Sequence, residues 1–164
     1  MLTKHQESKL EESLDILSED DRLLISGSAG VGKTFMVNEL VHSLKSADLI
    51  PRSRKTILCT APTNKALSVL KGKVDEMDNL VFTTVHSALK LKRTISKAGK
   101  VFFNPKFKPS NPPLKGVGIM IIDECSMINS DILKYIEEHA ENNGTKVIFI
   151  GDKKQINPVK EDES

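Results

Sequence analysis

The chain has 164 residues and a formal net charge of +2, with 28% charged and 4% aromatic side chains. That length suits a single domain with enough chain to bury a hydrophobic core. No run of about 18 apolar residues occurs, so the sequence predicts neither a transmembrane span nor a membrane partner. The N-terminal segment is acidic and amphipathic, unlike a secretory signal peptide, and we expect a cytoplasmic protein.

The chain has two cysteines, Cys59 and Cys125, and both lie in apolar segments. Their spacing matches neither a metal site nor a disulfide framework. We expect them to be the reduced thiols of an intracellular protein.

Hydrophobic periodicity predicts strands that alternate with helices along most of the chain. This alternation indicates an α/β fold in which helices cover both faces of a parallel sheet. In chain order we expect helix 3–18, strand 22–26, helix 33–46, strand 55–60, helix 64–72, strand 80–83, a short helix from Thr84, strand 117–122, helix 130–140 and strand 146–150.

The segment GSAGVGKT matches the phosphate-binding pattern G-x-x-x-x-G-K-[ST] at every fixed position. It stands between a predicted strand and a predicted helix, where backbone N–H groups and the helix N-terminus attract phosphate. Lys33 would reach the β- and γ-phosphates, and the Thr34 hydroxyl would bind Mg²⁺. The candidate nucleotide-binding residues are Gly27, Ser28, Ala29, Gly30, Val31, Gly32, Lys33 and Thr34.

Two carboxylates follow the apolar run at 117–122. A buried parallel strand that delivers acids at its carboxyl end is typical of a Walker B motif. Asp123 would hold Mg²⁺, and Glu124 would act as the general base on the attacking water. The alternative is a solvated turn.

Residues 79–122 contain no Asp or Glu and carry eight basic side chains, which favours a polyanionic partner over an ordinary solvated face. Within this stretch, 87–116 is predicted to be a small insertion with a hairpin at 91–103 that turns at 97–100. Four of the seven prolines lie between Pro105 and Pro113, so that part is neither helix nor central strand. The basic residues are Lys90, Lys92, Arg93, Lys97, Lys100, Lys106, Lys108 and Lys115.

Two short motifs are suited to nucleic acid. Pro62, Thr63, Asn64 and Lys65 follow the second strand, where hydroxyl, amide and lysine groups fit phosphates; the alternative is a loop capped by Thr63. The segment 84–87 offers Thr84 and His86, although a single histidine at a helix start is more often structural.

In the insertion, Lys97 and Lys100 would contact phosphates, and Phe102 and Phe103 would stack on bases. The alternative is that these phenylalanines and Phe107 form a small core of the insertion itself.

Four segments resemble motifs of superfamily 1 helicases. GDKKQINPV at 151–159 resembles motif III, in which Gln155 would sense the γ-phosphate or its attacking water. Residues 2–6 resemble the Q motif, with Gln6 reading adenine through its amide, and a capping box of Thr3 with Gln6 is compatible with that role. Residues 59–66 and 84–87 are similar to motifs Ia and Ib of the RecD-like group.

Taken in order, these motifs resemble the RecD-like (superfamily 1B) DNA helicases across residues 2–159. The resemblance implies a RecA-like P-loop NTPase domain, 1A, spanning 1–164 with 87–116 as a 1B-like insertion. It implies an ATP-dependent DNA helicase that uses Mg²⁺ and translocates 5′→3′ on single-stranded DNA, with Lys33, Glu124 and Gln155 as catalytic residues. A phage-encoded protein in a bacterial host is compatible with it.

In this group, a second RecA-like domain supplies arginines that complete the ATP site, and we expect the isolated chain to be nearly inactive without it. Two other function classes stay open. One is a P-loop ATPase of the AAA+ or DNA-packaging type, and the other is a non-enzymatic DNA-binding module that keeps the nucleotide fold.

Overall fold

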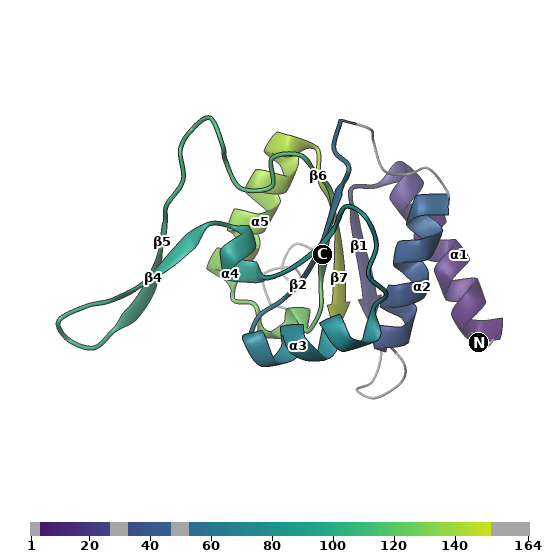
Figure 1. Ribbon diagram of the computed structural model, residues 1–164, viewed down its shortest axis with the longest axis horizontal. Coiled ribbons are helices and arrows are strands. Elements are labelled where there is room, and N and C mark those ends of the chain that lie inside the picture. The colour runs from purple at the N-terminus through teal and green to yellow at the C-terminus, as the bar shows by residue number, and fades with distance from the viewer. Residues whose placement is uncertain (1–3, 27–32, 47–52, 152–164) are drawn as a thin grey trace.

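The computed structural model describes residues 4–26, 33–46 and 53–151. Five strands form a fully parallel sheet (Figure 1). From one edge to the other, the order is β1 (Arg22–Ser26), β7 (Lys146–Gly151), β6 (Val117–Ile122), β2 (Thr56–Ala61) and β3 (Leu80–Thr84). The predicted α/β fold with a parallel sheet is confirmed.

The helices lie close to their predicted positions. They are α1 (Lys4–Glu19), α2 (Lys33–Ser46), α3 (Asn64–Lys73), α4 (Val85–Ala88) and α5 (Ser130–Asn143), with a 3-10 turn η1 (Cys125–Met127) that the sequence did not predict. Helix α5 runs three residues beyond the predicted end at 140. It stops where Gly144 adopts the left-handed conformation with φ 66°, which favours glycine at a helix C-terminus. In the described residues, no helix is both long and apolar enough to span a membrane.

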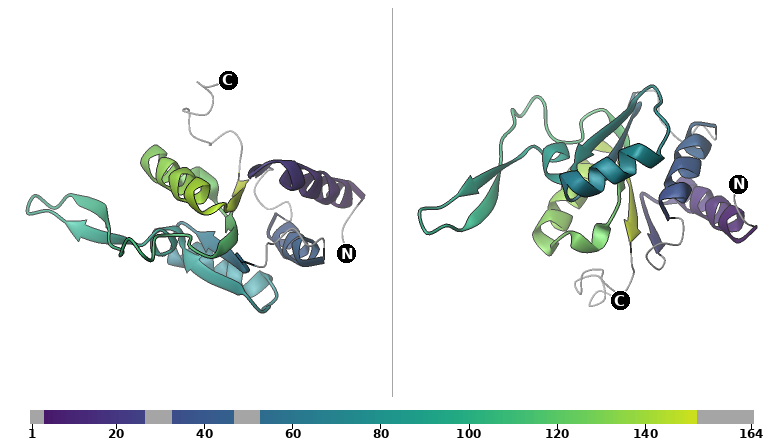
Figure 2. Two further views of the ribbon diagram at one scale, coloured as in Figure 1. Left: turned by 90° about the horizontal axis from the view of Figure 1, so that it is seen from above. Right: turned by 60° about the horizontal axis from the view of Figure 1, so that its bottom comes forward.

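Successive side chains along a strand point to opposite faces of the sheet, and the buried ones form two separate hydrophobic cores, one on each face. On β6, Ile119 and Ile121 face a cluster that includes residues of α2 and α3, whereas Met120 and Ile122 face a cluster built with α5. Figure 2 shows α2 and α5 on opposite sides of the sheet. All six residues of β6 are buried, which explains why its sequence is a continuous apolar run.

A two-stranded antiparallel hairpin, β4 (Leu91–Ile95) and β5 (Val101–Pro105), projects away from the sheet (Figure 1). Its turn lies at the predicted position, where Gly99 has φ 82° and its N–H donates to the Ser96 carbonyl at 2.9 Å. The strand β5 continues two residues beyond the predicted arm. It ends at Pro105, which an edge strand tolerates because its outer side needs no amide donor.

The hydrogen bond of Thr145 joins the start of β7 to the start of β6, and its contribution to stability can be tested by mutation. Its buried hydroxyl donates to the Val117 carbonyl at 2.8 Å, at the amino ends of β7 and β6. Thr145→Val should lower the free energy of unfolding by about 1–3 kcal/mol, because the carbonyl loses its donor without access to water. Thr145→Ser keeps the hydroxyl and should cost less in urea unfolding. A loss in Thr145→Ser with no loss in Thr145→Val would show that the methyl group matters and the hydrogen bond does not.

Candidate nucleotide and nucleic-acid site

Apart from residues 2–6, which precede β1, the predicted motifs share one position in the fold, because each lies at or directly after the carboxyl end of a strand. All five strands are parallel, so these ends lie along one edge of the sheet. Segment 27–34 follows β1, Pro62 follows β2, α4 follows β3, Asp123 follows β6, and β7 ends at Gly151. Ligands of open α/β sheets bind at this edge.

Part of the predicted nucleotide site lies outside the described residues. This applies to 27–32, to Gln155 and to the side chains of Gln6, Lys33 and Thr34. The backbone of Gln6 belongs to α1, and Lys33 is the first residue of α2. The start of α2 therefore lies at the same edge of the sheet as the end of β1, as a phosphate-binding loop requires.

The end of β6 is fixed by hydrogen bonds from its neighbour β2. The Asp123 N–H donates to the Thr60 carbonyl at 2.9 Å. In turn, the fully buried Thr60 hydroxyl donates to the Ile121 carbonyl at 2.8 Å. These two bonds fix the end of β6 and, with it, the backbone position of Asp123. The sequence analysis missed Thr60, although a hydroxyl inside an apolar strand was a signal for such a bond.

Glu124 has an unusual backbone. It adopts the left-handed conformation, with φ 53° and ψ 43°, which costs a residue other than glycine about 1–3 kcal/mol. Two hydrogen bonds hold it. The Glu124 N–H donates to Asp123 Oδ1 at 3.0 Å, and the Glu124 carbonyl accepts from the Met127 N–H at 3.1 Å. The surrounding turn therefore determines the direction in which the Glu124 side chain leaves the sheet edge.

The thiol of Cys59, on the neighbouring strand β2, stays protonated at neutral pH. Burial, together with the negative charge of Asp123, raises the pKa of Cys59 to about 12. Cys59 and Cys125 are both buried thiols outside any disulfide, as the sequence suggested. Cys59 thus adds no charge next to Asp123 at neutral pH.

The loop after β2 presents polar groups to solvent. Thr63, Asn64 and Lys65 are exposed, and Pro62 is partly exposed. The Thr63 hydroxyl accepts from the Ala66 N–H at 3.1 Å, so it caps α3. The capping alternative is therefore present in the structure, and Asn64 and Lys65 start the helix beside it, where the helix dipole attracts anions.

The segment after β3 has a structural role. Thr84 caps α4 by accepting from the Ser87 N–H at 3.3 Å. The ring of His86 stacks on Phe103 of the hairpin, with centroids 4.0 Å apart and planes inclined by 29°. Burial lowers the pKa of His86, which favours the neutral ring at this contact. The histidine therefore joins the base of the hairpin to the sheet.

The other end of the insertion is joined to α5. Phe107 meets His139 edge to face at 5.7 Å, and Tyr135 meets the same histidine at 4.4 Å. The Asn143 side chain also donates to the Pro113 carbonyl at 3.1 Å. Phe103 and Phe107 thus pack on histidines of the parent domain. Both rings are also exposed, and stacking on bases stays a prediction.

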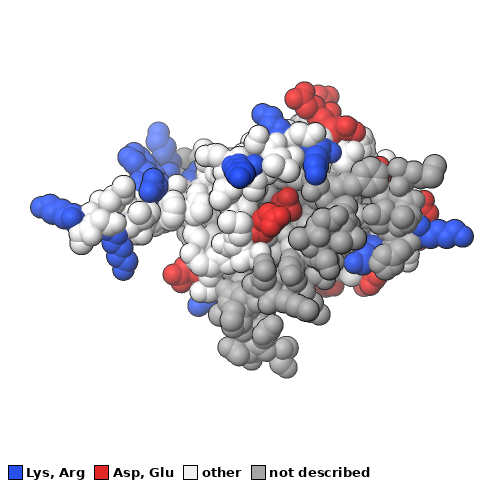
Figure 3. All heavy atoms as spheres, turned by 90° about the horizontal axis from the view of Figure 1, so that it is seen from below, with Lys and Arg blue, Asp and Glu red and all other residues white. Residues whose placement is uncertain are grey.

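The basic side chains of the insertion fall into two groups. Lys90 donates to the Asn111 carbonyl at 2.9 Å and Lys115 to the Ser110 carbonyl at 2.8 Å, so both help to hold the insertion's own backbone. Lys97 and Lys100 are exposed at the hairpin turn. The projecting arm shows blue Lys and Arg spheres and no red ones in Figure 3. Phe102 is also 39% exposed on this arm.

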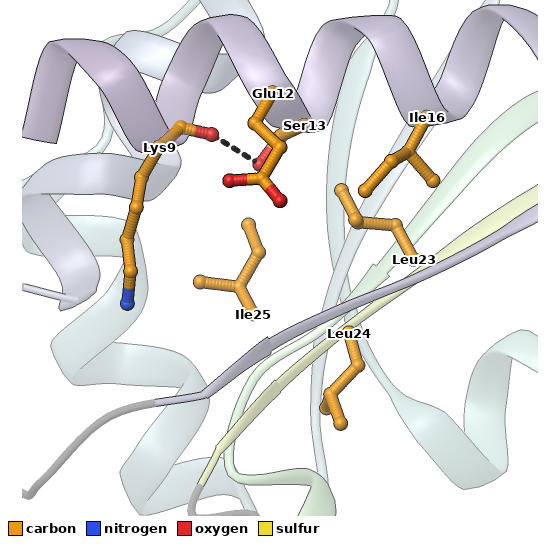
Figure 4. A pocket seen from close by; sticks show the side chains of 7 residues that line it. All are labelled: Lys9, Glu12, Ser13, Ile16, Leu23, Leu24 and Ile25. Carbon is orange, nitrogen blue, oxygen red and sulfur yellow. Dashed lines mark hydrogen bonds between the residues drawn. The ribbon is translucent and has the colours of Figure 1, made fainter.

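A pocket lies elsewhere, between α1 and β1 (Figure 4). Within it, the Ser13 hydroxyl donates to the Lys9 carbonyl at 2.7 Å. It contains none of the residues that the sequence analysis assigned to a site. The lining side chains are Lys9, Glu12, Ser13, Ile16, Leu23, Leu24 and Ile25.

Comparison with known proteins extends these observations. Residues 11–161 match the AAA domain family. The chain is 30% identical to the RecBCD enzyme subunit RecD of Buchnera aphidicola over 96% of its length and 26% of that relative. It is 29% identical to the ATP-dependent DNA helicase Pif1 of a Psychrobacter species over 90% of its length and 21% of that relative.

The fold has a similar counterpart among solved structures. A Bacteroides Pif1 bound to single-stranded DNA superposes with a TM-score of 0.60 at 22% identity, covering 93% of this chain and 32% of that one. The chain thus spans less than a third of each of these three proteins. The chain belongs to the AAA domain family, and its resemblance to the RecA-like N-terminal motor domain of RecD-like superfamily 1 helicases is confirmed.

Proposed function

We propose that this chain is the N-terminal ATP-binding domain of an ATP-dependent DNA helicase that translocates on single-stranded DNA. One observation carries the proposal. The parallel sheet brings the strand ends that precede the phosphate-binding, acidic and candidate nucleic-acid segments to a single edge. The names of the matched relatives, RecD and Pif1, support the same activity.

In this proposal, the phosphate-binding segment 27–34 holds the triphosphate, Lys33 contacts its β- and γ-phosphates and Gln6 reads adenine. Glu124 takes a proton from the attacking water, and Gln155 senses the γ-phosphate. The left-handed backbone of Glu124, held on both sides by hydrogen bonds, supports an oriented base. An amide such as Gln155 can both donate to and accept from a phosphate and its water.

Thr34 and Asp123 would hold Mg²⁺. Their hydroxyl and carboxylate oxygens are the ligands that Mg²⁺ prefers, and the start of α2 and the end of β6 meet at the same edge of the sheet. Mg²⁺ would neutralise charge on the phosphate oxygens.

DNA contacts come from two places in this proposal. Asn64 and Lys65 sit at the start of α3, with Pro62, Thr63 and Thr84 beside them on the strand ends. The segment 87–116 is the second place and acts as a 1B-like insertion whose hairpin separates strands. Its exposed Lys97, Lys100 and Phe102 support this role. The stacked rings of His86 and Phe103 orient the hairpin relative to the parent domain. Translocation 5′→3′ and an intracellular location are part of the proposal.

Nucleotide binding and hydrolysis should separate in two variants. Lys33→Ala should weaken Mg·ATP binding, because it removes a phosphate ligand, while Glu124→Gln should bind normally and lose hydrolysis, because it removes only the base. Calorimetric titration and single-turnover hydrolysis measure the two effects. Equal loss of affinity in both variants would show that the roles are misassigned.

The same measurements on the unmodified chain distinguish the alternatives. Steady-state turnover should stay below about 1 s⁻¹, which is slow for an enzyme, since the arginines that complete the site in this group come from a second domain. Faster turnover would contradict the helicase assignment and favour another class of ATPase. Absence of any Mg·ATP heat would favour a DNA-binding module without enzymatic activity.

Binding of a single-stranded oligonucleotide should depend on the hairpin lysines. The variant Lys97→Ala/Lys100→Ala should reduce the slope of log affinity against log salt by roughly 0.7 for each phosphate that a lysine no longer neutralises. Lys71→Ala/Lys73→Ala is the matched control, because these exposed lysines lie at the far end of α3 and remove the same charge. Equal slopes for the two double variants would mean that the arm acts only through net charge.

A further inference from the structure

Gly151 and Cys125 meet at the carboxyl edge of the sheet. Gly151 is the last residue of β7, and Cys125 is the first residue of η1, directly after Glu124. A Cβ atom added to Gly151 would lie 2.8 Å from the Cys125 sulfur and 3.2 Å from the Cys125 backbone nitrogen. Two non-bonded carbon atoms in optimal contact lie about 3.5–4.0 Å apart, so no side chain fits here without displacing the turn.

The requirement for glycine at this position is steric. Among the described glycines, those with positive φ are Gly99, Gly116 and Gly144, so the backbone of Gly151 would accept alanine. Both Gly151 and Cys125 are buried, at 7% exposure for the cysteine, and cannot relieve an overlap by turning into solvent. An added Cβ atom must therefore displace the Cys125 side chain, and at 3.2 Å it also presses on the Cys125 backbone nitrogen in η1.

That displacement would act on Glu124 directly. The Cys125 nitrogen belongs to the peptide unit that joins it to Glu124, so a push on this atom changes the ψ angle of Glu124. This residue holds a left-handed backbone through bonds from its N–H to Asp123 and from the Met127 N–H to its carbonyl. A strained conformation persists only where its surroundings fix it.

We propose that Gly151 and Cys125 are a positioning pair that sets the direction of the Glu124 carboxylate, an inference that rests on the proposed role of Glu124 as the general base. The two strands beside β6 then both position the acidic pair that follows it. Thr60 of β2 holds Asp123 through its carbonyl, and Gly151 of β7 bounds the turn that follows.

The test is a cycle of Gly151→Ala, Cys125→Ala and the double variant, with Gly72→Ala as control, because a Cβ atom at Gly72 meets nothing within 4 Å. Single-turnover hydrolysis with excess protein should fall about tenfold or more in Gly151→Ala, as expected for a displaced catalytic group, while Mg·ATP affinity changes by less than about twofold. The double variant should recover most of the rate of Cys125→Ala, since the sulfur that the alanine would strike is gone. Gly72→Ala should match the unmodified chain.

Two results would overturn the proposal: an unchanged rate in Gly151→Ala, or a double variant as slow as Gly151→Ala. A second readout is independent of activity. In the ¹H–¹⁵N spectrum, the Glu124 and Cys125 amide signals should shift in Gly151→Ala and return towards the Cys125→Ala positions in the double variant. If Gly151→Ala fails to fold, the double variant should fold again, and failure of both to fold would also contradict the pair. An unmodified chain that neither binds nor hydrolyses nucleotide would instead count against the proposed function, and the amide shifts would still test the contact.

Discussion

The site depends on one constraint, the parallel direction of all five strands. Parallel strands place every carboxyl end at the same edge, so segments that are far apart in sequence become neighbours there. The strand β6 lies between β7 and β2, and the acidic pair that follows it is held from both sides. Burial on both faces fixes the register of these strands, because each face of β6 packs into a separate core.

The acidic pair and the basic hairpin are held in different ways. The acidic pair grows out of a fully buried strand and is bound to it by backbone hydrogen bonds. The basic hairpin has exposed strands and reaches the parent domain through aromatic contacts at its two ends, His86 with Phe103 and His139 with Phe107. The sheet therefore fixes the backbone of the acidic pair, whereas side-chain contacts place the hairpin against the parent domain.

Much of this could be read from the sequence, and the reasons are physical. Continuous apolar runs such as Val117–Ile122 identify buried parallel strands, and Gly99 with its polar neighbours identifies the hairpin turn. The left-handed Glu124, the partner of the Thr60 hydroxyl and the close approach of Gly151 to Cys125 could not be read, since each depends on residues brought together only by the sheet. The contacts of Phe103 with His86 and of Phe107 with His139 could not be read for the same reason, because each pair joins two elements that are separate in the sequence.

Chemical-shift mapping with Mg·ATP tests most directly the claim that the carboxyl edge of the sheet is the nucleotide site. The account predicts that amide signals move at residues that end or follow strands at this edge, including Lys33, Asp123, Glu124 and Gly151. Signals at the opposite edge, such as Asn79, Gly116 and Thr145, should stay in place. Shifts confined to the opposite edge, or to the pocket between α1 and β1, would contradict the account.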